Sequence, residues 1–392
     1  NMNVKLKVLT AGVLFFTGQA LVAQEAKKDT ASKEKAIEEV ILVGFGRKQS
    51  VKEITGATST LGAKSLENVP VASVDKMLQG RLTGVQAGVA SGQPGGFANI
   101  RVRGVTSING GVSPIYVIDG VRVASGDLTA NTTTANILAN LNMDDVETLT
   151  VLKDATSTAV YGADAGAGVI VITTKSGKKG KPRFNLNFSH GFSDRAVKGH
   201  RGFTAAEYKS YLSTALINKF GSIPTTDDDI NGVLNSTASS DLRNEMENKQ
   251  AYTQNIDMGV SGGSDRISYY LSGNYFDQEG VVKNSGFKRL AFTSKVDYRA
   301  TDKLTITTDI QASYGKTKVL PDGGKFSNPI MAQYFLRPTD ALRNADGSYN
   351  FGEGNSLSNG LYNTAAVQAL NNMQAQTTRV FANLKVNYQI IK

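Results

Sequence analysis

Four acidic side chains in the middle of the chain are the first candidates for chemistry. Asp144, Asp145, Glu147 and Asp154 lie close together in the sequence, and clustered carboxylates are the ligands that Ca²⁺ takes in proteins. The residues between them lack the glycine-centred spacing of a calcium-binding loop. We therefore interpret these four residues as surface acids on a short helix rather than as a metal site.

Signatures of catalysis are missing from the rest of the sequence. The chain contains no cysteine, which excludes a disulfide framework, a thiolate metal site and a cysteine nucleophile. Its two histidines, His190 and His200, are too few for a histidine-rich metal site. The sequence contains Gly-x-Ser-x-Gly at residues 259–263, but this pattern falls on the strand predicted at 251–262 and not on the strand-to-helix turn of a nucleophile elbow. It has no complete phosphate-binding loop ending in Gly-Lys-Ser/Thr and no His-Glu-x-x-His. We expect no enzyme activity, no metal and no cofactor.

The net charge of +9 is spread along the chain. The basic run at residues 175–181 could suggest nucleic acid, but no recognition motif accompanies it, so we interpret it as a solvated linker and expect no nucleic-acid partner.

A different kind of site is a short extended segment near the N-terminus. It places two acidic residues before an apolar run that ends at Gly44. With no hairpin partner nearby in the sequence, such a strand could pair with another chain by strand addition. An ordinary first strand of the following domain would show the same pattern. The segment consists of Ile37, Glu38, Glu39, Val40, Ile41, Leu42 and Val43.

The residues before this segment resemble an export signal. Lys5 and Lys7 precede a mostly apolar stretch at residues 8–22, and the small residue Ala23 fits the position before a cleavage site. The apolar stretch is too short for a spanning helix, and the alternative is a buried core helix. We predict a signal peptide over residues 1–23, cleaved after Ala23, and a flexible linker over residues 24–36.

The middle of the chain is predicted to be a small α/β domain over residues 44–178. Residues 82–86 and 98–104 alternate apolar with polar side chains, which indicates strands with one buried face. Residues 114–120 predict a buried strand ending in an Asp-Gly turn. A helical turn leading into a strand is predicted at 143–154, a tightly packed helix at 155–162 and a closing buried strand at 168–175.

The last half of the chain is predicted to consist of long antiparallel strands. Each alternates apolar and polar side chains over about ten residues, as a transmembrane β-strand requires, although a sandwich with one wet face has the same period. The connections alternate between long and short, which favours a barrel with outer loops and short turns. The six predicted strands lie at 183–192, 251–262, 267–275, 290–298, 304–314 and 380–390.

The order of several motifs resembles one known family. Over about 110 residues the blocks follow the order of the plug domain in SusC/RagA-type TonB-dependent transporters. After Tyr161-Gly162 the family often has Ser-Arg-Ala-x-Asn-Gly, whereas this chain has Ala163-Asp164-Ala165-Gly166-Ala167-Gly168, which puts a local salt bridge or cap in doubt. The blocks are Val-Pro at 69–70, Leu-Gln-Gly-Arg at 78–81, Gly-Val at 84–85, Ile-Arg-Val-Arg-Gly at 100–104, Pro-Ile-Tyr-Val-Ile-Asp-Gly at 114–120, Leu-Lys-Asp-Ala at 152–155 and Gly-Val-Ile-Val-Ile-Thr-Thr-Lys at 168–175.

The resemblance implies a fold and a function. The fold is an α/β plug domain followed by antiparallel transmembrane β-barrel strands, and residues 37–43 fall where the family carries its TonB box. The implied activity is TonB-energised import of oligosaccharide or peptide across the outer membrane of a Gram-negative bacterium. The implied partners are TonB, a SusD-like surface lipoprotein, the glycan or peptide ligand and outer-membrane lipid.

Three expectations qualify this assignment. A non-transporting receptor or adhesin with the same plug and barrel is the alternative function. The β-sandwich domain that many relatives carry before the box has no room between residues 24 and 36. Since six strands at 182–392 fall short of the ~22 of a plugged barrel, we expect the chain to be an N-terminal fragment.

Overall fold

The computed structural model describes most of the chain after the predicted linker. The predicted signal peptide, the linker and Ile37, Glu38 and Glu39 lie outside the described residues. The described ranges are 40–43, 47–50, 58–66, 73–89, 92–104, 113–123, 136–196, 201–320, 328–352 and 361–390.

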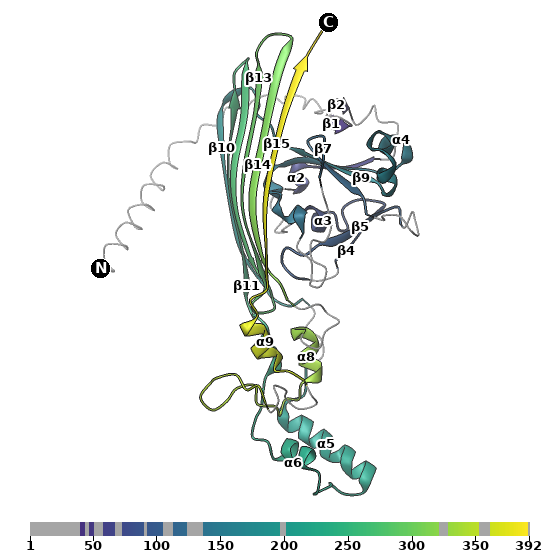
Figure 1. The fold of residues 1–392 in the computed structure, drawn as a ribbon, viewed down its shortest axis with the longest axis vertical. Helices are drawn as coiled ribbons and strands as arrows, with labels where there is room; N and C mark the ends of the chain where they lie inside the picture. Colours follow the sequence, from purple (N-terminus) through teal and green to yellow (C-terminus); the bar gives the residue numbers. More distant parts are fainter. Residues whose placement is uncertain are drawn as a thin grey trace, which may run out of the picture. The chain divides into compact units, whose positions relative to one another are not determined.

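The N-terminal α/β domain is built on a five-stranded sheet with the order β3-β8-β9-β6-β7 (Figure 1). Neighbours in this sheet pair antiparallel except β6 and β9, which pair parallel. A separate antiparallel pair joins β4 (Val85–Val89) to β5 (Ala98–Val102). The five strands are β3 (Thr58–Gly62), β6 (Ile115–Ile118), β7 (Val121–Val123), β8 (Val146–Leu152) and β9 (Val169–Thr174).

Short helices connect these strands and help to close a hydrophobic core. The core contains side chains from α2, α3, β5, β6, β8 and β9, among them Leu66, Met77, Tyr116 and Ile170, all within this domain. The helical segments are α2 (Ala63–Leu66), α3 (Val74–Met77), η2 (Ile137–Asn140), η3 (Met143–Asp145), α4 (Ala155–Thr158), η4 (Ala159–Tyr161) and η5 (Ala163–Ala167).

The predicted strands of this domain are confirmed, with two corrections. The strand expected at 82–86 begins only at Val85, because Gly84 has φ +70° and turns the chain before it. The predicted tightly packed helix at 155–162 is one short α-helix followed by a 3-10 turn, and most of its residues are exposed. The predicted Asp-Gly turn is confirmed: Asp119 and Gly120 have φ +48° and +90° and connect β6 directly to β7, as a two-residue hairpin requires.

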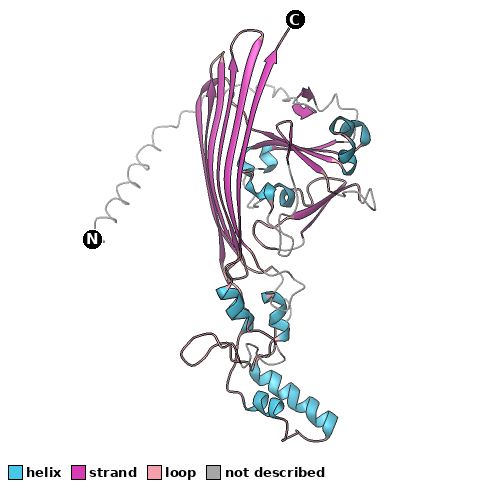
Figure 2. Ribbon diagram, in the orientation of Figure 1, coloured by secondary structure: helices cyan, strands magenta, loops and turns pink. Residues whose placement is uncertain are grey.

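The second half of the chain forms one six-stranded antiparallel sheet (Figure 2). Each strand pairs with the strands that precede and follow it in the sequence. All six predicted strands are confirmed, and the alternation of long and short connections is confirmed with them. The strands are β10 (Gly180–Ser193), β11 (Ala251–Gly263), β12 (Ile267–Glu279), β13 (Gly286–Arg299), β14 (Leu304–Lys318) and β15 (Gln374–Tyr388).

The two long connections of this sheet contain helices that pack together. The β10–β11 connection carries α5 (Ala205–Phe220), α6 (Asp228–Asn235) and α7 (Leu242–Met246), and the β14–β15 connection carries α8 (Pro329–Phe335) and α9 (Thr364–Leu370). Leu242 and Met246 of α7 share a buried cluster with Leu336 and Ala365 from the other connection. The two connections therefore form one folded unit at the same end of the sheet.

The two faces of the six-stranded sheet differ in the way the period-2 pattern predicts. One face exposes large apolar side chains, such as Phe184, Leu290 and Val380, while alternate residues such as Arg289 and Thr293 are polar and buried. An apolar outer face is what the hydrocarbon of a bilayer requires of a strand. No helix among the described residues is both long enough and apolar enough to cross a lipid bilayer.

Candidate functional site

The segment predicted to add to another chain is paired within its own chain. β1 (Val40–Val43) forms an antiparallel hairpin with β2 (Arg47–Ser50), with Val40 opposite Ser50 and Val43 opposite Arg47. The expectation that no hairpin partner lies nearby is therefore wrong, because only residues 44–46 separate the two strands. Strand addition to β1 has to use its second edge or displace β2.

The four acidic residues do not form a metal site, and one of them is not a surface acid. Asp145 is buried, and its carboxylate accepts hydrogen bonds from Tyr270 Oη on β12 and Thr293 Oγ1 on β13, both at 2.8 Å. Among the described residues no group of three or more potential ligands could hold a metal ion. The interpretation of Asp145 as a surface acid is wrong because its partners lie on strands far away in the sequence.

The other three acids have separate structural roles. Asp144 accepts a hydrogen bond from Asn255 Nδ2 at 2.8 Å. Asp154 caps α4 by accepting a hydrogen bond from the backbone N–H of Ser157 at 2.8 Å. Glu147 lies 3.6 Å from Lys178 in the linker between the domain and the sheet.

That linker is solvated as predicted, since the side chains of Lys178 and Lys179 are 78% and 71% exposed. Lys179 forms an ion pair with Asp265 in the short turn after β11. A side chain at Gly177 would overlap with the backbone of Tyr269, so glycine is required where the linker crosses β12. The linker therefore passes close to β12 at Gly177.

A buried arginine holds the α/β domain against the sheet. Arg289 of β13 donates to the carbonyl oxygens of Ala139 and Leu141, at 2.9 and 2.7 Å, and to Asn274 Oδ1 at 2.9 Å. A buried guanidinium is stable only when its N–H groups have acceptors. The carbonyl oxygens around η2 supply them, so the position of this turn is tied to β13.

A buried ion pair forms a second attachment. Lys295 Nζ of β13 lies 3.2 Å from Asp119 Oδ1 in the β6–β7 turn, and only 10% and 4% of the two side chains are exposed. The Asp119 carboxylate also accepts from the backbone N–H of Thr174 at 3.1 Å and from Thr174 Oγ1 at 2.6 Å. One carboxylate thus joins two strands of the α/β domain to the sheet.

In the strand predicted at 290–298, the alternation of apolar and polar residues places Thr293 and Lys295 on the polar face, whereas Arg289 lies just before that range. The available signal was the alternation itself, since Arg289 lies an even number of residues from both. A basic residue on the inward face of a strand needs an acceptor, and the sequence alone does not say which segment supplies it.

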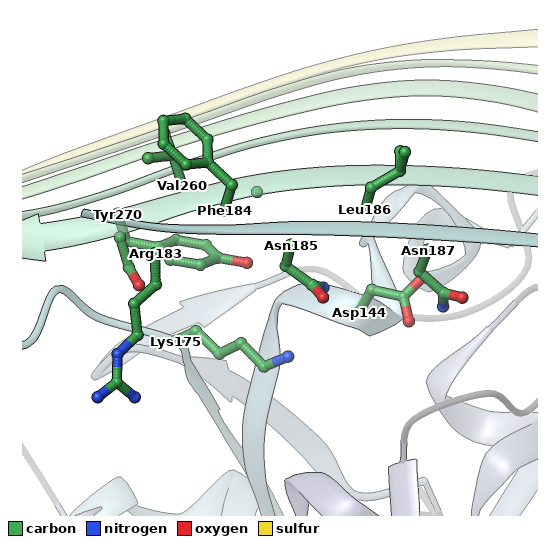
Figure 3. A pocket seen from close by; sticks show the side chains of 11 residues that line it. Asp144, Lys175, Arg183, Phe184, Asn185, Leu186, Asn187, Val260 and Tyr270 are labelled. Carbon is green, nitrogen blue, oxygen red and sulfur yellow. The ribbon is translucent and has the colours of Figure 1, made fainter. Parts of the chain in front are cut away.

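A pocket of about 360 Å³ lies where the α/β domain meets the first three strands of the sheet. Figure 3 shows Asn185 and Asn187 of β10 pointing toward Asp144, while Phe184 and Leu186 point to the opposite side of the strand. The pocket can form hydrogen bonds with a polar solute. Its lining also includes Lys175, Arg183, Ser261 and Tyr270.

Comparison with known proteins identifies the α/β domain. Residues 50–169 match the family model described as the TonB-dependent Receptor Plug Domain. A TonB-dependent receptor of Formosa agariphila is 34% identical over 320 residues, which cover 81% of this chain and 30% of the relative. The TonB-dependent receptor SusC of Bacteroides thetaiotaomicron is 30% identical over 80% of this chain and 30% of its own length. The chain carries the plug domain of TonB-dependent receptors and, over most of its length, is similar to SusC.

Solved structures agree on the fold of this receptor chain. The structure titled as the RagAB peptide transporter superposes with a TM-score of 0.72 at 22% identity, covering 86% of this chain and 40% of that chain. The α/β domain is accordingly the plug, and the six-stranded sheet is part of the barrel wall. The receptor chain spans about a third of the length of the curated relatives that it matches.

Proposed function

We propose that this receptor chain belongs to an outer-membrane importer that takes up oligosaccharide or peptide through a plugged barrel. The observation that carries the proposal is the docking of the plug on the inward face of strands whose outward face is apolar. Lys295 and Arg289 of the wall bind plug residues, while Leu290 and Phe292 of the same strand are exposed on the other face. Such a wall excludes lipid from a lumen that the plug fills.

We infer that the six strands are the first part of a larger barrel of the ~22-stranded type. Six strands leave two edges, and unpaired backbone groups in hydrocarbon each cost several kcal/mol. The proposed domains are a signal peptide at 1–23, a linker at 24–36, a TonB box at 37–43, the plug at 44–178 and barrel strands from residue 182.

Energy has to reach the plug from the inner membrane, and the proposed route is TonB bound to residues Ile37–Val43. Extended backbone at Val40–Val43 supports strand addition, which satisfies main-chain donors and acceptors whatever the side chains are. We further propose a SusD-like surface lipoprotein over the outer loops, in line with the two-component name RagAB of the structural neighbour.

Uptake by the full-length receptor tests this function. The native host should be grown with a glycan or with a peptide as its sole nutrient. Deleting the receptor gene should abolish growth on one of these nutrients, and deleting TonB should abolish growth on the same one. Restoring the receptor gene is the control. Ligand binding that persists while uptake is absent in the wild-type host would instead indicate a non-transporting receptor or adhesin.

Export is tested separately. N-terminal sequencing of the receptor from outer membranes should begin at Gln24, because Ala23 fits the residue before the cleavage site. A mature protein that still carries residues 13–16 would contradict the proposed signal peptide.

A further inference from the structure

Two carboxyl groups, one from the plug and one from the wall, meet where the plug contacts β14. Asp309 of β14 is 2% exposed, and Asp119 of the β6–β7 turn is 9% exposed. The amide nitrogen of Gln311 reaches both groups, because Nε2 lies 3.3 Å from each oxygen of Asp309 and 3.5 Å from Asp119 Oδ2. The two carboxyl groups also form a hydrogen bond with each other. They therefore share one buried site.

The positive charge at this site is smaller than the negative charge that two ionised acids would carry. Lys295 of β13 lies opposite Asp309 in the strand register, but its ion pair is with Asp119, at 3.2 Å. If both acids were ionised, one buried negative charge would have no compensating cation. Such a charge is costly enough that a buried acid takes up a proton instead.

The other elements around Asp309 do not change this balance. The charged groups that act on Asp309 are Asp119 and Lys295. On its other side, β15 places the neutral amide of Asn383 opposite Asp309. Two further lysines of these elements, Lys175 after β9 and Lys385 on β15, have interactions of their own. Neither is among the charges that act on Asp309.

The hydrogen bonds favour Asp119 as the ionised member of the pair. Its carboxylate accepts from the backbone N–H of Thr174 at 3.1 Å, from Thr174 Oγ1 at 2.6 Å and from Lys295 Nζ at 3.2 Å. Among the described residues, Asp309 accepts only from Gln311 Nε2. Donors stabilise the ionised form of a carboxyl group. A hydrogen bond between two carboxyl groups also requires a proton on one of them, since a carboxylate has none to donate.

We propose that the docked plug holds one proton at this site, carried by Asp309 and donated in a hydrogen bond to Asp119. When the plug and the wall separate, both groups enter water, where aspartic acid loses its proton well below neutral pH. Docking therefore takes up one proton, and separation releases it. The inference goes beyond import and does not depend on which nutrient is carried.

The sign of the resulting pH dependence follows from this exchange. The docked form binds one proton more than the separated form at neutral pH. The plug is therefore held more strongly as the pH falls from neutral toward the ordinary range of aspartic acid. As the pH rises, the cost of keeping Asp309 protonated increases, and the contact between the plug and the wall weakens.

Infrared spectroscopy of the purified full-length receptor tests the proposal directly, because the carbonyl stretch of a protonated carboxyl group is separate from the bands of carboxylates. At neutral pH we expect such a band, shifted by isotope labelling of aspartate and lost in Asp309→Asn. Asp119→Asn should remove the same band, because Asp309 then becomes the counter-ion of Lys295 and ionises. Two variants at different positions therefore test one proton, and either can be read if the other does not fold.

Asp297→Asn is the matched control on the inward face of the wall. Asp297 accepts hydrogen bonds from Thr307 Oγ1 at 2.6 Å and from Ser268 Oγ at 3.5 Å. These donors stabilise its ionised form, so the control should keep the band. The proposal is wrong if the band survives in Asp309→Asn or Asp119→Asn, or if the control loses it as well.

Thermal unfolding of the full-length receptor in detergent provides a second test. Between about pH 5 and about pH 8 the unfolding midpoint of the wild type should fall as the pH rises, because the folded receptor keeps a proton that the unfolded chain has lost. The decrease should be smaller in Asp309→Asn, since asparagine has no proton to keep, and unchanged in Asp297→Asn. An equal pH dependence in all three proteins would overturn the proposed proton.

Discussion

Individual buried charges determine how the plug is attached to the wall. Lys295 and Asp119 are both almost completely buried, and Asp119 has further hydrogen bonds from Thr174. Removing one partner of such a pair leaves a buried charge uncompensated and typically costs about 3–5 kcal/mol. Loss of either partner is therefore expected to weaken the contact between the plug and the wall.

Replacing Lys295 by methionine should loosen the plug in the full-length receptor. We expect a lower midpoint of thermal unfolding and an increase in TonB-independent entry of a large antibiotic, because the Asp119 carboxylate loses its cation. The matched control is Lys288→Met on the same strand, since Lys288 is 55% exposed and its partner Asp277, although buried, keeps hydrogen bonds from Tyr252 and Tyr275 within the wall. An exposed lysine contributes about 0–1 kcal/mol, so equal leakage from both variants would contradict the role assigned to Lys295.

The sequence predicts the orientation of some of these buried side chains but not the partners of others. The alternation in β13 identified Lys295 and Thr293 as inward-facing polar residues, because side-chain direction follows from the period of a strand. The burial of Asp145 could not be inferred, since its two partners, Tyr270 and Thr293, lie more than 100 residues away in the sequence. A local pattern contains no information about such partners.

At the scale of elements, the β1–β2 hairpin limits how a strand of a partner protein can pair with β1. A partner strand that uses the same edge of β1 must first displace β2, whereas the second edge requires no displacement. In both cases the affinity comes from main-chain hydrogen bonds. Leu42 lies in the middle of the paired register, opposite Lys48.

Leu42→Pro should abolish nutrient uptake by the full-length receptor and leave membrane insertion and ligand binding intact. Proline removes a backbone donor and fixes φ, which disrupts strand pairing. Leu42→Ala keeps the backbone groups and is the matched control, with uptake expected to remain close to wild type. Normal uptake by Leu42→Pro would rule out residues 37–43 as the coupling segment.

Helix α5 in the long β10–β11 connection begins with a capping box whose stability depends on pH. Hydrogen bonding from Arg201, and then from Thr204, lowers the pKa of Glu207 to about 2. Because the pKa in the folded state lies below its ordinary value, the stabilisation is complete above that ordinary value and is lost as the pH falls through about 2. Limited proteolysis near residues 201–221 should therefore accelerate between pH 4 and pH 2.

Glu207→Gln separates the two contributions at this cap. Glutamine can still accept the hydrogen bond from the Thr204 backbone, but it removes the ion pair with Arg201. We expect the proteolysis rate of this variant to be independent of pH over the same range. Acceleration equal to that of the wild type would show that another group causes the acid response.

Elements with a clear sequence period were predicted, and those without one were missed. Every strand of the wall was found because apolar and polar residues alternate over its length. The helices of the two long connections, such as α5, were not predicted. Two of them, α8 and α9, are short segments stabilised by packing with α7 across two connections, and no local pattern shows that contact.

At the scale of the whole molecule, the plug and the wall obtain their stability in different ways. The plug has its own hydrophobic core, contributed by residues from Leu66 to Ile172. The wall is a single layer of strands with an apolar outer face and an inward face whose charged residues bind the plug. A single sheet without a covering layer cannot bury both faces in water.

Separated halves of the chain should therefore behave differently. Residues 24–178 should be soluble and unfold cooperatively, because their core is complete without the wall. Residues 182–392 should aggregate in water, since Phe184, Leu186 and Val380 are 70% or more exposed and Arg289 loses its plug acceptors. Sedimentation and thermal unfolding followed by circular dichroism measure both properties.

Refolding controls determine whether the apolar face or the missing plug causes the aggregation. Detergent covers the apolar face and should keep residues 182–392 in solution, whereas adding the soluble plug without detergent should not, because the plug contacts only the inward face. The detergent-refolded whole chain should show no heat-modifiable gel shift, because six strands cannot close around a plug of this size when even eight-stranded barrels are filled by side chains. A monomeric, folded 182–392 fragment in plain buffer would show that the outward face does not require lipid, and a heat-modifiable pore from the whole chain would show that six strands suffice.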